Sequence, residues 1–347
     1  MKDRQAWMDP KAEADIVSPD GEYAALPAAL FEPVGDGPRE RERIARPSTT
    51  YWQDVWARLR RDPLAVGGMV VLILIALVAV FGPMLSPYAY DGASFTNTNQ
   101  PPGATHWFGT DKLGRDIMVR VMYGARISLI IGLAAAAINL VIGVLYGGVA
   151  GFVGRRVDMV LMRLVDILIG LPRLLYVILI MMVWGATIQS IVFALCLASW
   201  TTTARVVRSQ VMTLKNSEYA MAARLTGASG FQILLRHLVP NCMGPIIVST
   251  AFLIPEAIFD EAFLAFLGIG VQVPIASWGT LANEAIASLA SKPYQMFFPV
   301  AAICLTMFSL NFIGDGLRDA LDPRLNKAVL NGEDGVRATK AGRIAKI

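Results

Sequence analysis

Side chains that bind metals or nucleotides are scarce in this sequence. Its 347 residues include two histidines, His106 and His237, and three cysteines, Cys196, Cys242 and Cys304. The histidines lie far apart and the cysteines have no CxxC or metal-ligand spacing, so we expect no metal site and interpret the cysteines as small packing residues. No GxxxxGK(S/T) stretch is present, so any nucleotide hydrolysis must occur on another chain. We expect neither a catalytic residue nor a bound cofactor in this chain.

Charged residues are also few. They make up 17% of the chain, against 55% hydrophobic residues, which lies outside the range of ordinary soluble domains. The composition therefore predicts an all-α integral membrane protein, with room for about six spanning helices of ~20 residues each. The net charge of +4 comes from clusters beside apolar segments, which favours membrane topology over nucleic-acid binding.

The first 50 residues lack long apolar runs. Prolines interrupt this polar stretch, and a mixed charge run extends from Arg39 to Arg46. We expect residues 1–50 to be a disordered cytoplasmic tail without a removable signal peptide, and a regulatory or docking role for it stays open. Residues 51–63 follow as a predicted interfacial amphipathic helix, with aromatic and aliphatic residues at helical spacing and arginines near its end.

Six apolar segments are then predicted to span the membrane within a domain of residues 64–316. The arginines before the first segment place the N-terminus in the cytoplasm by the positive-inside rule, and six spans return the C-terminus to the same side. The connections are an external loop 86–125, a cytoplasmic loop 208–240, an external loop 268–297 and a cytoplasmic tail 317–347. The predicted spans are 64–85, 127–153, 158–184, 188–207, 243–267 and 298–313.

Glycines line one side of the second predicted span. Gly143, Gly147 and Gly151 recur at every fourth position, and such a strip lets another helix pack closely in lipid. The partner is either another segment of this chain or a second protein, and the sequence leaves both open.

A polar island between two apolar segments, residues 217–240, is the most informative stretch. Ser217 is a candidate N-cap, Glu218 suits the positive end of a helix dipole, and Gly227 can end the helix. A short helix over about residues 218–226 is predicted, with side chains small enough for another protein to approach its backbone. Basic residues on both sides indicate the cytoplasmic face. The alternative is an amphipathic loop helix lying on the bilayer.

This stretch resembles the cytoplasmic loop of ABC importer permeases. The match comprises Glu218, Ala222, Ala223, Gly227 and the ending Leu238-Val239-Pro240. In that family the helix docks into a groove on an ATPase subunit and is called a coupling helix. The resemblance implies that the ATPase-coupling residues here are Glu218, Ala222, Ala223, Arg224 and Gly227.

A second motif lies in the first external loop, from His106 to Asp116. It resembles the segment shared by C-type permease subunits of oligopeptide, dipeptide and nickel importers. Its charged members can form paired hydrogen bonds that pin an irregular loop, so we favour a structural clamp over a substrate contact. Segments 268–279 and 314–324 also resemble this family, and the likeness covers residues 51 to 325. The motif residues are Gly109, Thr110, Asp111, Gly114, Arg115 and Asp116.

Charged residues inside predicted spans are candidates for the transport pathway. Each costs on the order of 2.5–3.5 kcal/mol at mid-bilayer, so none should face lipid. For Asp166 and Arg173 the alternatives are an internal ion pair or a position near the cytoplasmic interface, and Pro172 allows a kink between them. Glu256 and Asp260 share one helix face and can offer negative potential to a peptide's amino terminus. Solvation at the external interface is the alternative for these two and for Glu261.

The resemblance implies a type I ABC importer permease fold in the bacterial cell membrane. It also implies the partners: a homologous second permease forming a heterodimer, two cytoplasmic ABC ATPases that bind ATP and Mg, and an extracytoplasmic peptide-binding protein. The expected function is peptide import. Three alternatives remain: the same machine carrying nickel or another small solute, an ion-coupled secondary transporter, which would favour matched internal repeats, and a non-transporting membrane scaffold.

Overall fold

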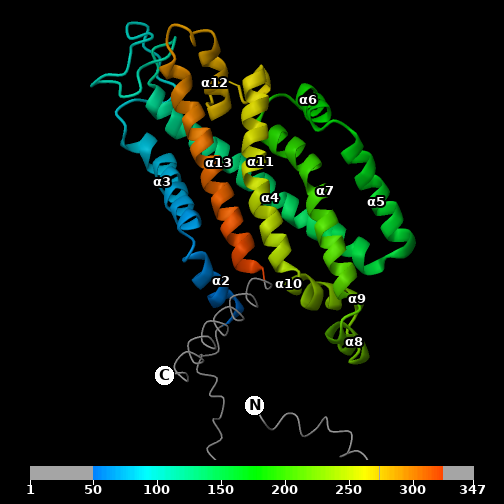
Figure 1. Cartoon of the computed structure of the whole chain (residues 1–347). Coiled ribbons are helices and arrows are strands. Elements are labelled where there is room, and N and C mark those ends of the chain that lie inside the picture. The colour runs from blue at the N-terminus through cyan, green and yellow to red at the C-terminus, as the bar shows by residue number, and fades with distance from the viewer. Residues whose placement is uncertain (1–49, 273, 323–347) are drawn as a thin grey trace, which may run out of the picture. The chain divides into compact units, whose positions relative to one another are not determined.

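The computed structural model describes residues 50–272 and 274–322, which are helical and contain no β-strand (Figure 1). The described residues from Tyr51 to Asp322 belong to one compact unit. The predicted tails therefore lie largely outside the described residues. The last helix, α13 (Tyr294–Leu321), continues past residue 316 into the predicted C-terminal tail.

Helix α2 (Tyr51–Leu59) leads through a short turn to α3 (Pro63–Leu85), the first long apolar helix. The Asp62 carboxylate accepts the Leu64 N–H at 3.0 Å and so starts α3. Proline suits the first helical position because it has no N–H to satisfy there. The outward side chains of α3 are mostly apolar, as expected of a helix surrounded by lipid.

Helix α4 (Ile117–Val153) has 37 residues, which at 1.5 Å per residue is about 55 Å and exceeds the ~30 Å hydrocarbon core. It starts before the predicted residue 127, because the Asp116 carboxylate accepts the Val119 N–H at 2.9 Å and caps the helix there. The predicted loop 86–125 is therefore wrong in its last part, which is helix.

The third predicted span, 158–184, is two helices, α5 (Arg155–Gly170) and α6 (Arg173–Trp184), bent by 85°. Pro172 lies at the break. The residue before it, Leu171, is extended at φ −87° and ψ 135°, because contact with the proline ring disfavours the helical conformation there. The kink that the sequence allows is thus a sharp corner.

The predicted loop 208–240 is mostly helical, and the predicted external loop 268–297 also contains a helix, which the sequence missed. The second half of the described chain holds one further bent pair, in which residues 230–241 and 243–269 meet at 70°. The elements are α7 (Ile188–Leu214), α8 (Glu218–Leu225), α9 (Gly230–Gln232), the π-helix η3 (Ile233–Leu238), α10 (Val239–Asn241), α11 (Met243–Leu264), the π-helix η4 (Ala265–Ile269) and α12 (Trp278–Ile286).

The glycine strip of α4 packs against α7 of the same chain. A Cβ added at Gly147 would lie 2.2 Å from the Ala204 carbonyl oxygen, and one at Gly143 would lie 2.6 Å from Thr203 Cβ. Only glycine permits this approach, since a contact under 3 Å forces one backbone away. The partner that the sequence left open is therefore within this chain.

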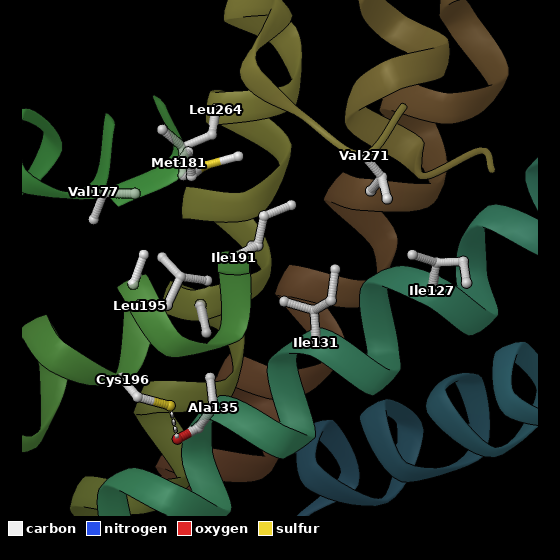
Figure 2. Packing of buried hydrophobic residues seen from close by; sticks show 12 residues of the cluster. Ile127, Ile131, Ala135, Val177, Met181, Ile191, Leu195, Cys196, Leu264 and Val271 are labelled. Atoms are coloured by element: carbon white, nitrogen blue, oxygen red, sulfur yellow. Dashed lines mark hydrogen bonds between the residues drawn. The ribbon is translucent and has the colours of Figure 1, made fainter. Parts of the chain in front are cut away.

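The core between the helices is apolar and draws on segments far apart in the chain (Figure 2). Ile131 of α4, Leu195 of α7 and Leu264 of α11 are at most 1% exposed. Met181 of α6 and Val271, which follows η4, close the same cluster. The corner after α5 and the segment after α11 are thus fixed by burial against the two central helices.

Four of the described helices are long and apolar enough to cross a membrane, or up to six if each bent pair counts as one span. The four are α3, α4, α7 and α13. The chain is therefore a multi-pass membrane protein. Helix α8 and helix α12 lie at opposite ends of the long helices (Figure 1), and these two ends carry the sequence motifs.

Candidate functional site

Helix α8 (Glu218–Leu225) forms almost over the predicted residues 218–226. Gly227 follows it with a φ of +87°, the left-handed conformation that glycine adopts without strain. Ser217 precedes the helix, but its hydroxyl donates to the Leu214 carbonyl at 2.7 Å and caps no N–H of the first turn. Ser217 therefore occupies the predicted N-cap position, but its hydroxyl ties α8 to the end of α7 and does not cap the first turn.

The inner side of α8 rests on α7 and η3. Ala220 is fully buried and Ala223 is 8% exposed, and because both side chains are single methyl groups the α8 backbone lies close to its support. We call this support the α8 mount. Its residues are Val207, Val211, Ile233, Leu234 and Leu238.

The outer side of α8 is uncovered in the single chain. Glu218, Ala222 and Leu225 follow one another at i, i+4 and i+7 and are all exposed, with Leu225 at 89%. The Arg224 guanidinium lies over the Phe152 ring at 5.8 Å, so this predicted coupling residue contacts the end of α4. An apolar tip on a short helix is the kind of surface that another protein covers.

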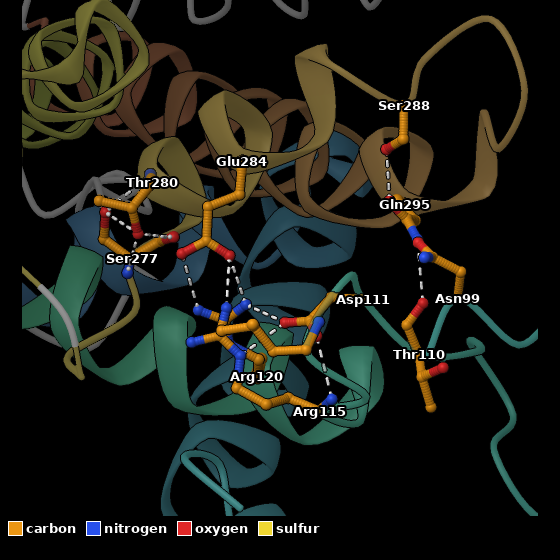
Figure 3. A network of polar contacts seen from close by, with 11 residues as sticks. Asn99, Thr110, Asp111, Arg115, Arg120, Ser277, Thr280, Glu284, Ser288 and Gln295 are labelled. Carbon is orange, nitrogen blue, oxygen red and sulfur yellow. Dashed lines mark hydrogen bonds and ion pairs between the residues drawn. The ribbon is translucent and has the colours of Figure 1, made fainter. Parts of the chain in front are cut away.

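The opposite end holds a network of four buried or partly buried charges (Figure 3). The Asp111 carboxylate accepts from Arg115 Nε at 2.6 Å and from Arg120 Nη1 at 2.7 Å. Both arginines also donate to Glu284 Oε2 of α12, at 2.8 and 2.6 Å. We call these four residues the clamp. Because Arg120 is only 1% exposed, its charge depends on these two carboxylates for solvation.

The remaining motif residues shape the loop around the clamp. Asp116 caps α4, and its second oxygen lies 2.8 Å from His106 Nδ1. Gly109 and Gly114 have φ of +78° and +71°, and a Cβ at Gly114 would lie 1.9 Å from the Ser94 carbonyl. The Thr110 carbonyl accepts from Gln295 of α13 at 3.0 Å. These contacts bind the loop to α4, α12 and α13.

Two clamp residues, Arg120 and Glu284, are absent from the predicted site. Arg120 lies one helical turn after Asp116, so recognising the cap at Asp116 would have placed it on the inner side of α4. Glu284 was missed because residues 268–297 were predicted as loop. Ser277 and Thr280 form a capping box at the start of α12, which is the signal that could have revealed that helix.

The corner between α5 and α6 carries a second charged group. Arg173 pairs with both Glu256 and Asp260 of α11, and its Nη2 donates to Ser199 of α7 at 2.6 Å. The structure thus brings three of the predicted pathway residues together. One positive and two negative charges meet there, and Glu256 remains 51% exposed.

Two further ion pairs join α5 to α7. Arg205 Nη2 lies 2.7 Å from Asp166, with both side chains about half exposed at 48% and 51%. Arg208 makes a bidentate contact with Asp158. Asp166 therefore has an ion-pair partner within the chain, and it also lies on an open surface.

Glu261 differs from the other predicted pathway residues. Its side chain is 0% exposed, and its Oε2 accepts from Ser128 of α4 at 3.0 Å. In this conformation the carboxyl group faces the interior of the chain and lines no surface. The Glu261 carboxyl therefore connects α11 with α4.

The two sides of the helix bundle differ in polarity. On α3 the exposed residues are apolar, such as Ile73 at 58% and Phe81 at 53%. Exposed charges also occur on α5, α7 and α11, including Asp166, Arg205 and Glu256, whereas those of α13 lie toward its C-terminal end, at Asp315, Arg318 and Asp319. Since such charges avoid hydrocarbon, the α5–α7–α11 side must meet water or protein, and the α3 side suits lipid.

Two family models match this chain, and neither covers residues 103–142. Residues 143–327 match the family model described as "Binding-protein-dependent transport system inner membrane component". Residues 50–102 match the "N-terminal TM domain of oligopeptide transport permease C".

Curated relatives are similar over nearly their whole length. The oligopeptide transport system permease protein OppC of Bacillus subtilis is 47% identical over 87% of this chain and 99% of its own. The dipeptide transport system permease protein DppC of the same organism is 48% identical over 83% and 91%. OppC of Escherichia coli is 42% identical over 82% and 94%. This chain therefore belongs to the family of inner-membrane components of binding-protein-dependent transport systems.

Proposed function

We propose that this chain is the transmembrane permease subunit of an ATP-driven ABC importer of oligopeptides or dipeptides. The observation that carries the proposal is α8: an exposed helix with an apolar tip, mounted on the ends of the long helices, at the position of the family's coupling motif. The peptide substrate is supported by relatives named as oligopeptide and dipeptide permeases.

The proposed topology has six spans, with both ends of the chain in the bacterial cytoplasm. Each bent pair then counts as one span, α8 lies on the cytoplasmic side and the clamp lies outside. Two ATPase subunits that bind ATP and Mg would meet α8, and an extracytoplasmic peptide-binding protein would approach the clamp end. A second permease would complete the pathway on the α5–α7–α11 side.

The proposed mechanism is mechanical. When the ATPases close on ATP, they displace α8, and the displacement passes through Ala220 and Ala223 to the α8 mount. Val207 and Val211 belong to α7, and η3 leads through α10 to the start of α11. Movement of α8 therefore reaches the two helices that carry Ser199, Glu256 and Asp260. Differential affinity of the ATPases for the two arrangements of the bundle supplies the driving force.

The proposed pathway lining consists of the charged residues that remain on a surface: Asp166, Arg173, Glu256 and Asp260. Their ion pairs make them tolerable at membrane depth, and their partial exposure leaves them accessible to a wet passage. We do not place Glu261 in this lining, because its carboxyl is enclosed by the chain.

The proposal is tested at Leu225, the exposed apolar tip of α8. In the assembled importer, Leu225→Asp should abolish peptide-stimulated ATP hydrolysis and peptide uptake, while membrane insertion and thermal stability stay unchanged, because Leu225 is 89% exposed. Asn216→Asp is the matched control, since it adds the same charge just before α8. Normal uptake by the Leu225 variant would exclude α8 as the contact. Failure of the unaltered chain to co-purify with an ATPase would exclude the importer.

A further inference from the structure

The face of α2 that points away from the protein combines tryptophan and arginine. Trp52, Trp56 and Arg60 lie at i, i+4 and i+8, on one stripe of the helix and its extension. The tryptophans are 51% and 47% exposed, and the Arg60 guanidinium lies 4.8 Å from the centre of the Trp56 ring. Arg61 is exposed beside them. Amphipathic aromatic rings with a cation are the composition of a surface at the membrane–water boundary.

The connection to α3 fixes the depth of this face. Arg60, Arg61 and Asp62 alone separate α2 from α3, and four Cα–Cα steps from Leu59 to Pro63 reach at most about 14 Å. Leu64, in the first turn of α3, is already 59% exposed and apolar. If α3 enters the hydrocarbon at that turn, as its apolar surface favours, this short link keeps α2 close to the headgroup layer.

In the part of the chain that the structure describes, one arginine near α2 forms an ion pair and two do not. Arg58 pairs with Asp54 one turn earlier, so these two charges cancel. No carboxylate of the described residues forms an ion pair with Arg60 or Arg61. The outward face of α2 therefore carries uncompensated positive charge at headgroup depth, which complements an anionic lipid surface and not a zwitterionic one.

The inner face of α2 rests on the ends of two long helices. Val55 and Leu59 are 7% and 4% exposed and belong to one cluster with Leu317, Ala320 and Leu321 of α13 and Ile247 and Val248 of α11. A Cβ added at Gly244, in the first turn of α11, would lie 3.7 Å from the Tyr51 hydroxyl of α2. Helix α11 starts directly after η3 and α10, the elements that follow α8. The same short helix thus presents tryptophan and arginine on one side and lies beside the start of α11 on the other.

We propose that α2 binds anionic phospholipid headgroups through Trp52, Trp56, Arg60 and Arg61, and thereby holds the start of α11 at a fixed level of the bilayer. The binding is independent of what the protein transports. Its consequence for coupling rests on the proposed function: the mount of α8 can transmit a displacement efficiently only if α11 is held against the membrane plane.

The test uses the full chain, with its partners if they are needed for reconstitution, in vesicles of phosphatidylglycerol and phosphatidylcholine. Either lipid is brominated, and tryptophan fluorescence quenching is measured. The signal of Trp52 and Trp56 is the difference between the unaltered chain and Trp52→Phe/Trp56→Phe, so all other tryptophans cancel. We expect brominated phosphatidylglycerol to quench this difference signal at least threefold more than brominated phosphatidylcholine at equal mole fraction.

Charge variants separate specific binding from mere proximity. Arg60→Gln/Arg61→Gln should remove the preference for phosphatidylglycerol, since each arginine near an anionic surface changes binding roughly fivefold. Arg60→Lys/Arg61→Lys should retain it. Equal quenching by both lipids in the unaltered chain would overturn the proposal, as would a difference signal quenched by aqueous acrylamide and by neither lipid.

The consequence for coupling has its own readout. In the assembled importer, Arg60→Gln/Arg61→Gln should lower the number of peptides imported per ATP at least twofold in phosphatidylglycerol vesicles and have little effect in phosphatidylcholine vesicles. Lipid-selective quenching without any peptide import would contradict the proposed function and leave the lipid site standing. Import that is equally efficient in both lipids and both variants would overturn the role of α2 in coupling.

Discussion

The two ends of this molecule are built in opposite ways. At the clamp end, buried charges and crowded glycines fix an irregular loop to three helices. At the α8 end, a short helix lies on two alanine methyl groups, and the glycine that ends it has nothing within 4 Å of an added Cβ. The clamp end thus has buried charge pairs and tight backbone contacts that α8 and Gly227 lack among the described residues. The α8 end combines small contacts with an exposed surface, as suits an element that a partner displaces.

The largest expected effect comes from breaking the clamp. Arg120→Met leaves Asp111 and Glu284 with less compensation in a buried network, and removing one partner of a buried ion pair costs about 3–5 kcal/mol. We expect a strong loss of thermal stability in detergent and early proteolysis of the loop before α4. Lys112→Gln, an exposed neighbour outside the network, is the control and should behave as the unaltered protein does. An Arg120→Met chain with unchanged thermal stability would contradict the stabilising role of the clamp.

The next effect is measured by the same substitution at both ends. Gly114→Ala and Gly227→Ala each place alanine at a positive φ, which costs roughly 1–2 kcal/mol. At Gly114 the Cβ also meets the Ser94 carbonyl, and overpacking adds about 1–3 kcal/mol. The melting temperature of Gly114→Ala should therefore be well below that of Gly227→Ala. A bulkier residue such as Gly227→Val should leave insertion intact and reduce uptake per ATP hydrolysed.

Equal melting temperatures of the two alanine variants would contradict the difference between the ends. Normal coupling in Gly227→Val would separately count against the role of the turn after α8.

The smallest effect on stability is expected from the partly exposed group around Arg173. Glu256→Gln/Asp260→Asn removes both carboxylates from Arg173, so the net charge of the group changes from −1 to +1. Because Glu256 is 51% and Asp260 16% exposed, thermal stability should fall less than in Arg120→Met, whose arginine is only 1% exposed. Uptake of peptides with a basic residue should fall several-fold more than uptake of neutral peptides, measured by competition in vesicles. Equal loss for both peptide classes would remove the electrostatic role and leave Arg173 a structural link.

Sequence patterns predicted those features that depend on neighbouring residues. Long apolar runs gave α3 and α13, and the Glu218-to-Gly227 spacing gave α8, because hydrophobic periodicity and helix ends are local. Ion pairs between distant segments could not be predicted from these patterns, and Arg120 and Glu284 are 164 residues apart. Helix α12 has nine residues, and it was missed because it is too short and lies in a segment rich in turn residues.

Packing between distant segments also decides where Glu261 and the glycines of α4 lie. The charge of Glu261 was visible in the sequence, and its enclosure beside Ser128 was not, because the register between α11 and α4 is set by packing. Similarly, the glycine strip of α4 predicted a close helix contact but did not identify α7 as the partner.

Helix α4 is long enough to contact both ends of the molecule. Its first turns carry Arg120 of the clamp, and near its other end the Gly151 carbonyl accepts from Lys215 and the Phe152 ring lies under Arg224. A single uninterrupted helix therefore connects the clamp with the end that supports α8. If it pivots about its middle by roughly 5°, its tips shift in opposite directions by about 5 Å relative to each other. Helix α4 would then couple the position of the clamp directly to the position of the end that supports α8.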